Sequence, residues 1–490
     1  MALFRVGIVR RHGDSGNLIG HGTGDEDGGR PSGSAGGDRA GRLRVGFLSF
    51  VRPTFDVKEA EGIAGQSRDV LLELGQRWQV DWALHPSVIS TVGVAEQTAR
   101  EWSGQVDGLV IQFATFVDAR FMDVLARQLD VPVVLWALRE PGRYGERLSL
   151  NSLTGVNLAA HQLKRVGRSC EIVYGGLGET EVLERLRQSL LVWKARKRLR
   201  HWSVLAVGDA PDGFMFSEPT SASLDRLGIA VHRLSLPELF DKAERVPQTQ
   251  VDAVIGLTEP HVSGMGALPQ EQVSRYARLR SVLEAAVEET GAQAVAIRCW
   301  PEFFTEFGGA ACSTVSALTE NGVMSSCEAD IFGALSMDIL YQLTGSPAYL
   351  GDLVEIDEAA QGVVFWHCGA GAFSLARKDT GAQAGYHPNR NMGFTLEFGL
   401  KPGAVTVLRI GEVPGEGLRA LVGVGEVLDD PQRFRGTSAK VRMAGEGDVK
   451  ARTLRVMALG FEPHYAIAYG DVRAEMLALL SSLGIPVHEF

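Results

Sequence analysis

The stretch RLRVGFLSFV (residues 42–51) decides the fold class. It is a short apolar run that ends at Arg52-Pro53, and this pattern predicts a buried strand followed by a turn. Similar runs follow at DGLVIQFAT (107–115) and VPVVLWAL (131–138), with amphipathic stretches of helical period between them. Short apolar runs separated by helices of ten or more residues indicate βαβ units and a mostly parallel sheet.

The same alternation returns beyond a basic helix predicted near residues 180–200. Strands are predicted at WSVLAVGD (202–209), GIAVHRL (228–234), VDAVIGLT (251–258) and AQAVAIRCW (292–300). Past about residue 350 the helical period fades, and segments such as GAVTVLRIGEV (403–413) alternate between glycine-marked turns. This texture predicts an antiparallel sheet or small barrel, closed by a helix at DVRAEMLALLSSLG (471–484).

These patterns divide the chain into four parts. We expect a flexible leader at 1–41, an N-terminal α/β domain at 42–198, a second α/β domain at 199–347 and a β-rich domain at 348–490 that carries the terminal helix. Residues 13–41 contain eleven glycines and little that can be buried, so they cannot recover the entropy lost on ordering. The predicted fold class is α/β: two Rossmann-like domains with parallel sheets plus a barrel-like C-terminal domain.

Composition narrows the class of protein. The 490 residues are 45% hydrophobic and 22% charged, which is typical of globular chains, and the formal charge of −10 offers no basic field for nucleic acid or an anionic membrane surface. The N-terminus lacks the features of a signal peptide, and no apolar run is long enough to span a bilayer. The five cysteines show no CxxC spacing. We therefore expect a cytoplasmic protein that binds neither nucleic acid nor membrane.

Several well-known motifs are absent. The sequence contains no G-x-G-x-x-G leading into a helix, no P-loop, no G-x-S-x-G elbow and no H-E-x-x-H. A nucleophilic cysteine at Cys327 or Cys368 stays open as an alternative, although no spacing nominates a partner base.

Acidic residues mark the junction between the second α/β part and the β-rich part. Glu328 lies in GVMSSCEADIFGALSMDIL (322–340), where a strand runs into a helix, and we place it at the strand's carboxyl end and in the first helical turn. The alternative is compensation of the helix dipole, which Asp330 provides equally well. Asp352 follows in SPAYLGDLVEID, where a capping or turn role competes, as do two later acids, Glu355 and Asp357.

Two histidines stand in apolar surroundings in the β-rich part. His367 lies in VVFWHCGAGAF, and His464 begins the apolar run of GFEPHYAIAYGD. Each alone is as well explained by a satisfied core histidine. Together with Glu328 and Asp352 they form a set of two carboxylates and two imidazoles, which suits a divalent ion such as Mn²⁺, Mg²⁺, Co²⁺ or Zn²⁺ with positions left for substrate oxygens.

At these residues the sequence resembles the L-fucose/L-arabinose isomerase superfamily of metal-dependent aldose–ketose isomerases. The resemblance is carried by CWPEF (299–303), ENGVMSSCEADIFGALSMDIL (320–340), GDLVEID (351–357), FWHCGAGAFSLA (365–376), EFGLKPGAVTVLRI (397–410) and HYAIAYGD (464–471). It is firm from about residue 299 onward, looser over 42–298 and absent before 42. The leader, the shorter chain and Pro463, where many relatives have a second histidine, depart from the family's pattern.

The resemblance implies specific roles. Glu328, Asp352 and His464 would hold the metal, with Mn²⁺ first among the alternatives and His367 as a further ligand, and Glu328 and Asp352 would also carry protons. Members assemble as trimers, tetramers or hexamers whose active sites take residues from a neighbouring subunit, and Arg52 is the candidate for that role. Contacts to sugar hydroxyls are expected from Trp300, Glu302, Trp366 and Asn391.

The reaction implied is the interconversion of an aldose and a ketose by proton transfer through a cis-enediol. Relatives act on different hexoses, deoxyhexoses and sulfonated hexoses such as sulfoquinovose, so the resemblance leaves the sugar open; Arg52, Arg139, Arg298 and Arg390 are available to bind a sulfonate or phosphate. Two alternatives remain: a non-catalytic sugar-binding or regulatory protein of the same fold, and an epimerase or lyase that uses the same enediol chemistry.

Overall fold

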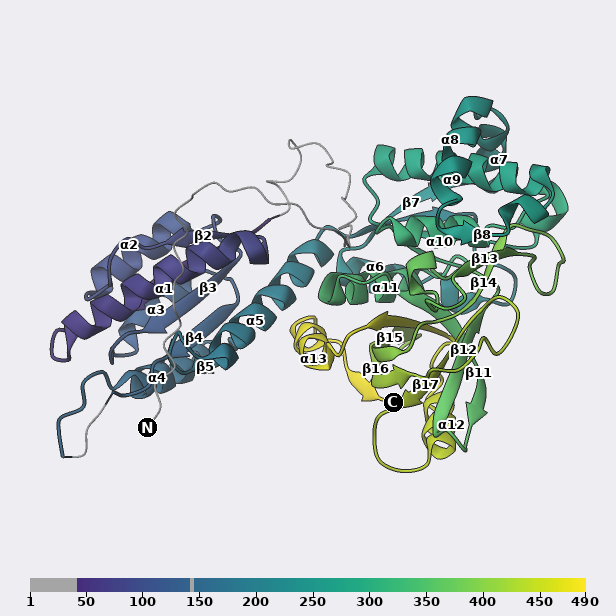
Figure 1. The fold of residues 1–490 in the computed structure, drawn as a ribbon. Helices are drawn as coiled ribbons and strands as arrows, with labels where there is room; N and C mark the ends of the chain where they lie inside the picture. Colours follow the sequence, from purple (N-terminus) through teal and green to yellow (C-terminus); the bar gives the residue numbers. More distant parts are fainter. Residues whose placement is uncertain (1–41, 142–144) are drawn as a thin grey trace, which may run out of the picture. The chain divides into compact units, whose positions relative to one another are not determined.

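The computed structural model describes residues 42–141 and 145–490, so the predicted leader lies outside the described residues (Figure 1). Residues 42–490 form one compact unit. The boundaries predicted within that unit, at 198/199 and 347/348, remain predictions. Within the described part of the chain, no helix is long and apolar enough to cross a membrane.

The first sheet is entirely parallel, with strand order β2-β1-β3-β4-β5. Its strands are β1 (Leu43–Phe50), β2 (Val80–Leu84), β3 (Gly108–Phe113), β4 (Val133–Ala137) and β5 (Glu171–Tyr174). The helices are α1 (Val57–Trp78), α2 (Val92–Trp102), α3 (Arg120–Gln128), α4 (Ser152–Arg165) and α5 (Thr180–Leu199). Residues of α2, α3 and α4 share one apolar cluster, and residues of α1 and α5 share another, so helices cover both faces of the sheet.

A second, smaller sheet is also parallel, with order β10-β9-β6-β7. Its strands are β6 (Ser203–Val207), β7 (Ala230–Leu234), β9 (Ala294–Ile297) and β10 (Met324–Ser326). The associated helices are α6 (Ser221–Leu227), α7 (Leu236–Glu244), α8 (Gln248–Thr258), α9 (Gln270–Thr290), α10 (Cys312–Glu320) and α11 (Ile331–Thr344). The strand order reverses between β6 and β9, and ligands of open α/β sheets bind outside the carboxyl ends of strands at such a point.

One predicted strand of this region is wrong. The run VDAVIGLT forms the greater part of α8, whose Val251, Val254 and Thr258 are buried at helical spacing. A short apolar run does not by itself distinguish a buried strand from one face of a helix, and here packing against α9 favours the helix.

The C-terminal part contains a closed antiparallel ring of strands. The ring runs β16-β15-β18-β11-β12-β17 and closes by pairing of β17 with β16. These strands are β11 (Tyr349–Asp357), β12 (Gly362–His367), β15 (Gly403–Val413), β16 (Gly417–Val427), β17 (Thr437–Met443) and β18 (His464–Tyr469). The sheet is extended by β8 (Val262–Ser263), β13 (Ala382–Gly385), β14 (Thr395–Gly399) and β19 (Val487–Glu489), and the remaining helices are α12 (Val449–Ala458) and α13 (Arg473–Ser482). The predicted fold class, two parallel α/β sheets and a barrel-like antiparallel sheet, is confirmed.

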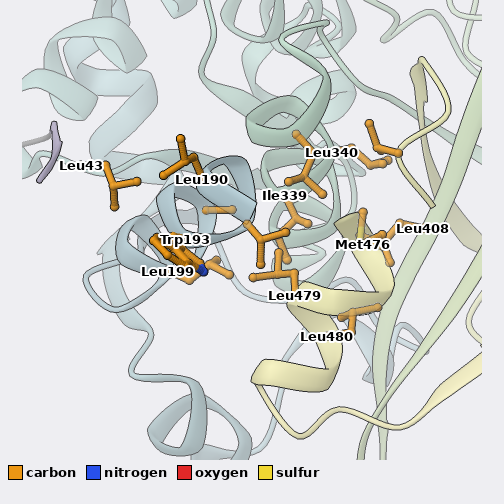
Figure 2. Close-up of a cluster of buried hydrophobic side chains, with 14 of the residues drawn as sticks. Leu43, Leu190, Trp193, Leu199, Ile339, Leu340, Leu408, Met476, Leu479 and Leu480 are labelled. Atoms are coloured by element: carbon orange, nitrogen blue, oxygen red, sulfur yellow. The ribbon is translucent and has the colours of Figure 1, made fainter. Parts of the chain in front are cut away.

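Helix α11 joins these layers. It packs against β10 on one side and against the barrel strands β15 and β18 on another. Figure 2 shows the apolar cluster beside it, in which Leu190, Trp193 and Leu199 of α5 lie near Ile339 and Leu340 of α11 and near Met476, Leu479 and Leu480 of α13. The N-terminus of α11 is therefore held where the carboxyl edge of the second sheet meets the barrel.

Candidate metal centre

Glu328 occupies the turn between β10 and α11. The backbone of Glu328 and Ala329 is left-handed, with φ of 51° and 57°, a conformation that costs non-glycine residues about 1–3 kcal/mol each. The amide of Ala329 donates to the carbonyl of Ile297 at the end of β9, which ties the turn to the sheet. Glu328 therefore lies at the strand's carboxyl end as predicted, but before the helix rather than in its first turn, because Asp330 is the N-cap of α11.

Three barrel strands place their residues in a row beside this turn. Asp352 of β11 lies opposite His464 of β18 on one side and opposite Trp366 of β12 on the other. Residues directly opposite one another in an antiparallel pair present their side chains on the same face. His367, the last residue of β12, follows Trp366. Asp352 thus belongs to a strand, and the competing capping or turn role is wrong.

The carboxylate of Glu328 meets both histidines. Its Oε2 lies 3.3 Å from Nε2 of His464 and 3.5 Å from Nε2 of His367. Asp352 Oδ1 lies 3.6 Å from the same Nε2 of His464. The side chains of the two histidines are 2–3% exposed and that of Glu328 is 13% exposed, whereas that of Asp352 is 33% exposed. Three buried groups converge, and a more open carboxylate stands at the rim.

Burial and charge act in opposite directions on these groups. Burial opposes ionisation of Glu328, yet the close approach and charge of His367 and His464 outweigh it and lower the pKa of Glu328. Burial would lower the pKa of His464, but Asp330 and Glu328 raise that pKa to about 10. The charges of Glu328 and of the protonated His464 ring therefore stabilise each other in the metal-free protein.

Two thiols near the centre are disfavoured as nucleophiles. Contact with Cys299 and burial raise the pKa of Cys327, and contact with Cys312 and burial raise the pKa of Cys368. A nucleophilic cysteine needs a lowered pKa in a partly exposed setting. The alternative of cysteine catalysis therefore finds no support in the surroundings of either thiol.

The residues expected to contact sugar hydroxyls lie in different settings. Trp300 Nε1 donates to Oε1 of Glu328 at 3.3 Å, so its indole borders the centre directly. Trp366 stacks on His367 with ring centroids 6.4 Å apart, and its Nε1 donates to the carbonyl of Arg435. The carboxylate of Glu302 accepts two bonds of 2.8 Å from Arg298.

Asn391 and Arg390 share an exposed turn with His387. The amides of both residues donate to the carbonyl of His387, whose ring packs edge-on against Phe304, and the guanidinium of Arg390 lies over the same Phe304 ring. His387 in turn has a ligand atom within 4.8 Å of the thiol of Cys368, the neighbour of His367. This turn therefore lies near the centre, with His387 and Cys368 between it and His367.

Arg52 lies at the carboxyl end of β1, in the first sheet. Its amide donates to Thr115 Oγ1 and its guanidinium lies 5.5 Å from the ring centre of Phe116. Both partners belong to the loop that follows β3. These contacts do not bring Arg52 to Glu328 of the same chain.

Comparison with known proteins shows which family the chain belongs to. Residues 367–490 match the family described as L-fucose isomerase, C-terminal domain. The chain is 38% identical over 449 residues to a sulfoquinovose isomerase of Alkalicoccus urumqiensis, which covers 91% of this chain and 99% of that protein. It is 40% identical over 437 residues to a sulfoquinovose isomerase of Priestia aryabhattai, which covers 88% of this chain and 96% of that protein. The chain belongs to the fucose isomerase-like superfamily.

The superfamily resemblance inferred from the sequence is thereby confirmed, and the protein is an aldose–ketose isomerase. A sulfoquinovose isomerase of Clostridium sp. (strain MSTE9) is similar over a shorter stretch, with 38% identity over 382 residues. Among solved structures, a carbohydrate transporter of Acidothermus cellulolyticus 11B covers 62% of this chain at 12% identity and a TM-score of 0.18, which is too low to bear on fold or function.

The residues of this isomerase fit a divalent metal ion. Glu328 Oε2 and His367 Nε2 are buried with no hydrogen-bond partner, and buried polar atoms without partners are uncommon. One ligand atom each from Glu328, His367 and His464 lie within 4.8 Å of one another. A carboxylate and two imidazoles form a donor set that divalent ions of the Mn²⁺ to Zn²⁺ series accept.

The sequence reasoning missed the layer behind these residues in the isomerase. Asp330 and Arg409 are fully buried, and Glu462 is 9% exposed. Phe216, in the loop after β6, packs edge-on against the ring of His464. One usable signal was present: Arg409 is a charged residue in the middle of the apolar strand GAVTVLRIGEV, and a charge in such a place needs a buried partner.

Proposed function

We propose that the protein converts sulfoquinovose to its ketose, with Glu328, Asp352, His464 and His367 holding a divalent ion, Mn²⁺ first among the alternatives. The single observation that supports the site is the convergence of Glu328 with two buried histidines, at which Glu328 Oε2 and His367 Nε2 have no hydrogen-bond partner. The support for the sugar is the 38–40% identity to proteins named sulfoquinovose isomerase.

The reaction moves one hydrogen from C2 to C1 and another from the C2 hydroxyl to the C1 oxygen, so it needs a base and an acid placed along one edge of the open-chain sugar. We assign the C1–C2 proton transfer to Glu328 and Asp352. Asp352 is one-third exposed and stands at the rim, where an entering sugar meets it first. The bound metal would supply electrostatic stabilisation of the negative charge that develops on the two sugar oxygens.

Two tryptophans, Trp300 and Trp366, border the centre. Trp300 holds Oε1 of Glu328, which leaves Oε2 directed at the histidines. Since the N–H of Trp366 is already engaged, Trp366 would meet the sugar with its ring rather than with a hydrogen bond. Glu302 and Asn391 are further candidates for contacts to sugar hydroxyls.

Arg390 is our candidate for the sulfonate. Arg139 and Arg298 are each tied by paired hydrogen bonds to a glutamate, Glu179 and Glu302 respectively. Within the described ranges 42–141 and 145–490, Arg390 has no carboxylate within ion-pairing distance. A guanidinium without a carboxylate is free to bind an anionic oxygen group in bidentate fashion.

We further propose a homo-oligomer in which Arg52 completes the site of a neighbouring subunit, acting in the cytoplasm on a small-molecule sugar. A trimer, tetramer or hexamer would satisfy this. Mixing Arg52→Gln with Glu328→Gln protein, each inactive alone, should restore activity in mixed oligomers. No recovery after subunit exchange, shown to occur by light scattering of tagged chains, would contradict a shared site.

The decisive assay treats the purified protein with EDTA and then returns Mn²⁺, with sulfoquinovose as substrate and NMR in D₂O as readout. The proposal expects activity to be lost and regained, with deuterium entering at C1 or C2 only. Activity that ignores chelation, or cleavage or epimer products, would favour the alternatives of a metal-free protein, a lyase or an epimerase. Sugar binding without turnover would indicate a non-catalytic protein.

A further inference from the structure

Asp330 stands directly behind His464. The carboxylate is fully buried, and its Oδ2 accepts a hydrogen bond of 2.9 Å from Nδ1 of His464. Its other oxygen, Oδ1, accepts from the amide of Gly333 at 2.8 Å and so caps α11. One side chain therefore fixes both the start of the helix and the ring that faces Glu328.

Arg409 of β15 holds Asp330 in place. Its Nη1 donates to Oδ2 of Asp330, its side chain is fully buried, and its Nε lies 3.6 Å from Oε2 of Glu462. Neither Nε nor Nη2 of Arg409 has a hydrogen-bond partner. A buried guanidinium that makes so few bonds contributes little net stability, because its desolvation is poorly repaid.

Two glycines leave room for this arrangement. A Cβ at Gly333 would lie 2.5 Å from Oδ2 of Asp330, and a Cβ at Gly411 would lie 2.2 Å from Oε1 of Glu462. Both distances are far below van der Waals contact, so any larger residue would displace a carboxylate. The backbone of α11 and the backbone of β15 are thus both shaped around the two acids.

We propose that Asp330, held by Arg409, is a positioning residue that keeps Nδ1 of His464 as the donor and directs Nε2 at Glu328 and Asp352. This inference rests on the proposed metal centre. A carboxylate behind a metal-binding histidine fixes the tautomer and the orientation of the ring, and loss of such a partner typically lowers metal affinity by about 10–100-fold.

A second aspartate on the same helix provides a matched control. Asp338 is also fully buried and also bound to an arginine, with Oδ1 at 3.0 Å from Arg198. Its Oδ2 accepts a hydrogen bond from Trp202, and among the described contacts neither Arg198 nor Trp202 touches His367 or His464. Asp330→Asn keeps a good N-cap residue for α11, because the amide oxygen can still accept from Gly333, and it replaces the charged oxygen that faces His464 with an NH₂ group. Asp338→Asn imposes the same loss of a buried charge away from the centre.

The test measures Mn²⁺ dissociation constants of the full-length wild type, Asp330→Asn and Asp338→Asn by counting free Mn²⁺ with EPR. We expect Asp330→Asn to bind Mn²⁺ about 10–100-fold more weakly, with activity returning toward that of the wild type as Mn²⁺ is raised. Asp338→Asn should keep the wild-type Mn²⁺ dissociation constant even if its melting temperature falls as much as that of Asp330→Asn. Equal Mn²⁺ affinity in Asp330→Asn and the wild type, or equal losses in the two variants, would overturn the inference.

If Asp330→Asn does not fold, Arg409→Lys replaces it, since lysine keeps the buried charge but not the guanidinium. The expected loss of Mn²⁺ affinity is then about tenfold, and an unchanged dissociation constant would overturn the inference.

Failure of the proposed function would give a different result from failure of this inference. A wild type that binds Mn²⁺ but does not isomerise sulfoquinovose rejects the substrate, while the comparison of affinities still decides the role of Asp330.

Discussion

The carboxyl ends of β1 and β10 each lie at the carboxyl edge of a parallel sheet, β1 between two strands of the first sheet and β10 at the edge of the second, and they carry opposite chemistry. After β1 comes Arg52, exposed, with its guanidinium over Phe116. After β10 comes Glu328, largely buried against two histidines of the barrel. A parallel sheet offers a ligand position at the end of its strands. The comparison teaches that what packs on that edge decides its chemistry, and at β10 the barrel strands β12 and β18 provide the partners.

The largest effect on activity is expected from substituting Glu328, which follows β10. Glu328→Gln removes the carboxylate that both histidines face, so kcat should fall by about 10³-fold, within the range for loss of a positioned acid or base. Steady-state kinetics at saturating Mn²⁺ measure this. Glu355→Gln, which removes a carboxylate of β11 that pairs with Arg433 at the surface, is the control and should change kcat less than twofold. Comparable losses in both variants would refute the assignment.

A second prediction concerns metal binding and pH. The pKa of His464 is raised to about 10, so its ring is protonated at neutral pH in the metal-free protein, and a metal must displace that proton. Mn²⁺ affinity should therefore rise as pH increases toward 10, by about tenfold per pH unit for each proton released. Calorimetry in buffers of different ionisation enthalpy counts the protons. Affinity that is flat between pH 6 and 8 would show that His464 is not a ligand.

A third prediction compares two arginines: Arg390, in the turn near the metal centre, and Arg139, which follows β4 of the first sheet. Arg390→Gln should raise KM for sulfoquinovose by about tenfold, since a charge-assisted hydrogen bond contributes roughly 1.5–3 kcal/mol, and should leave KM for a non-sulfonated aldose unchanged. Arg139→Gln, whose guanidinium is committed to Glu179 near the end of β4, should alter neither KM. Equal effects of Arg390→Gln on both sugars would remove the sulfonate assignment.

The smallest effect on stability is expected at Arg52, although the same substitution is expected to abolish activity in the unmixed protein. Its side chain is exposed and makes no ion pair at the distances found for other arginines of the described chain, so Arg52→Gln should change the free energy of unfolding by less than about 0.5 kcal/mol. Chemical denaturation measures this change. A stability loss above about 2 kcal/mol would give Arg52 a structural role and would remove the reason to assign it to a neighbour's site.

Much of this architecture was readable from the sequence because apolar periodicity is local. The runs at β1, β3 and β4 predicted the first sheet, and the glycine-divided segments at β15 and β16 predicted the barrel. The run in α8 failed because eight residues do not separate strand from helix without knowledge of α9. Glu328, Asp352, His367 and His464 could be nominated from the family resemblance, and the fold brings Glu328 and the two histidines together, with Asp352 beside His464.

What lies behind the site could not be predicted in the same way. Asp330 reads as an ordinary N-cap, and its contact with His464 depends on pairing across 134 residues of sequence. Arg409 meets Asp330 only because β15 packs on α11. Such contacts depend on tertiary packing rather than on local pattern, so only the structure shows them.

The most direct measurement is anomalous diffraction at the manganese absorption edge from crystals grown with Mn²⁺. A single strong peak within coordination distance of Glu328 and of Nε2 of His464, next to Asp352, is the predicted result. Full occupancy of Mn²⁺ elsewhere in the chain, with these side chains hydrogen-bonded only to one another, would contradict it.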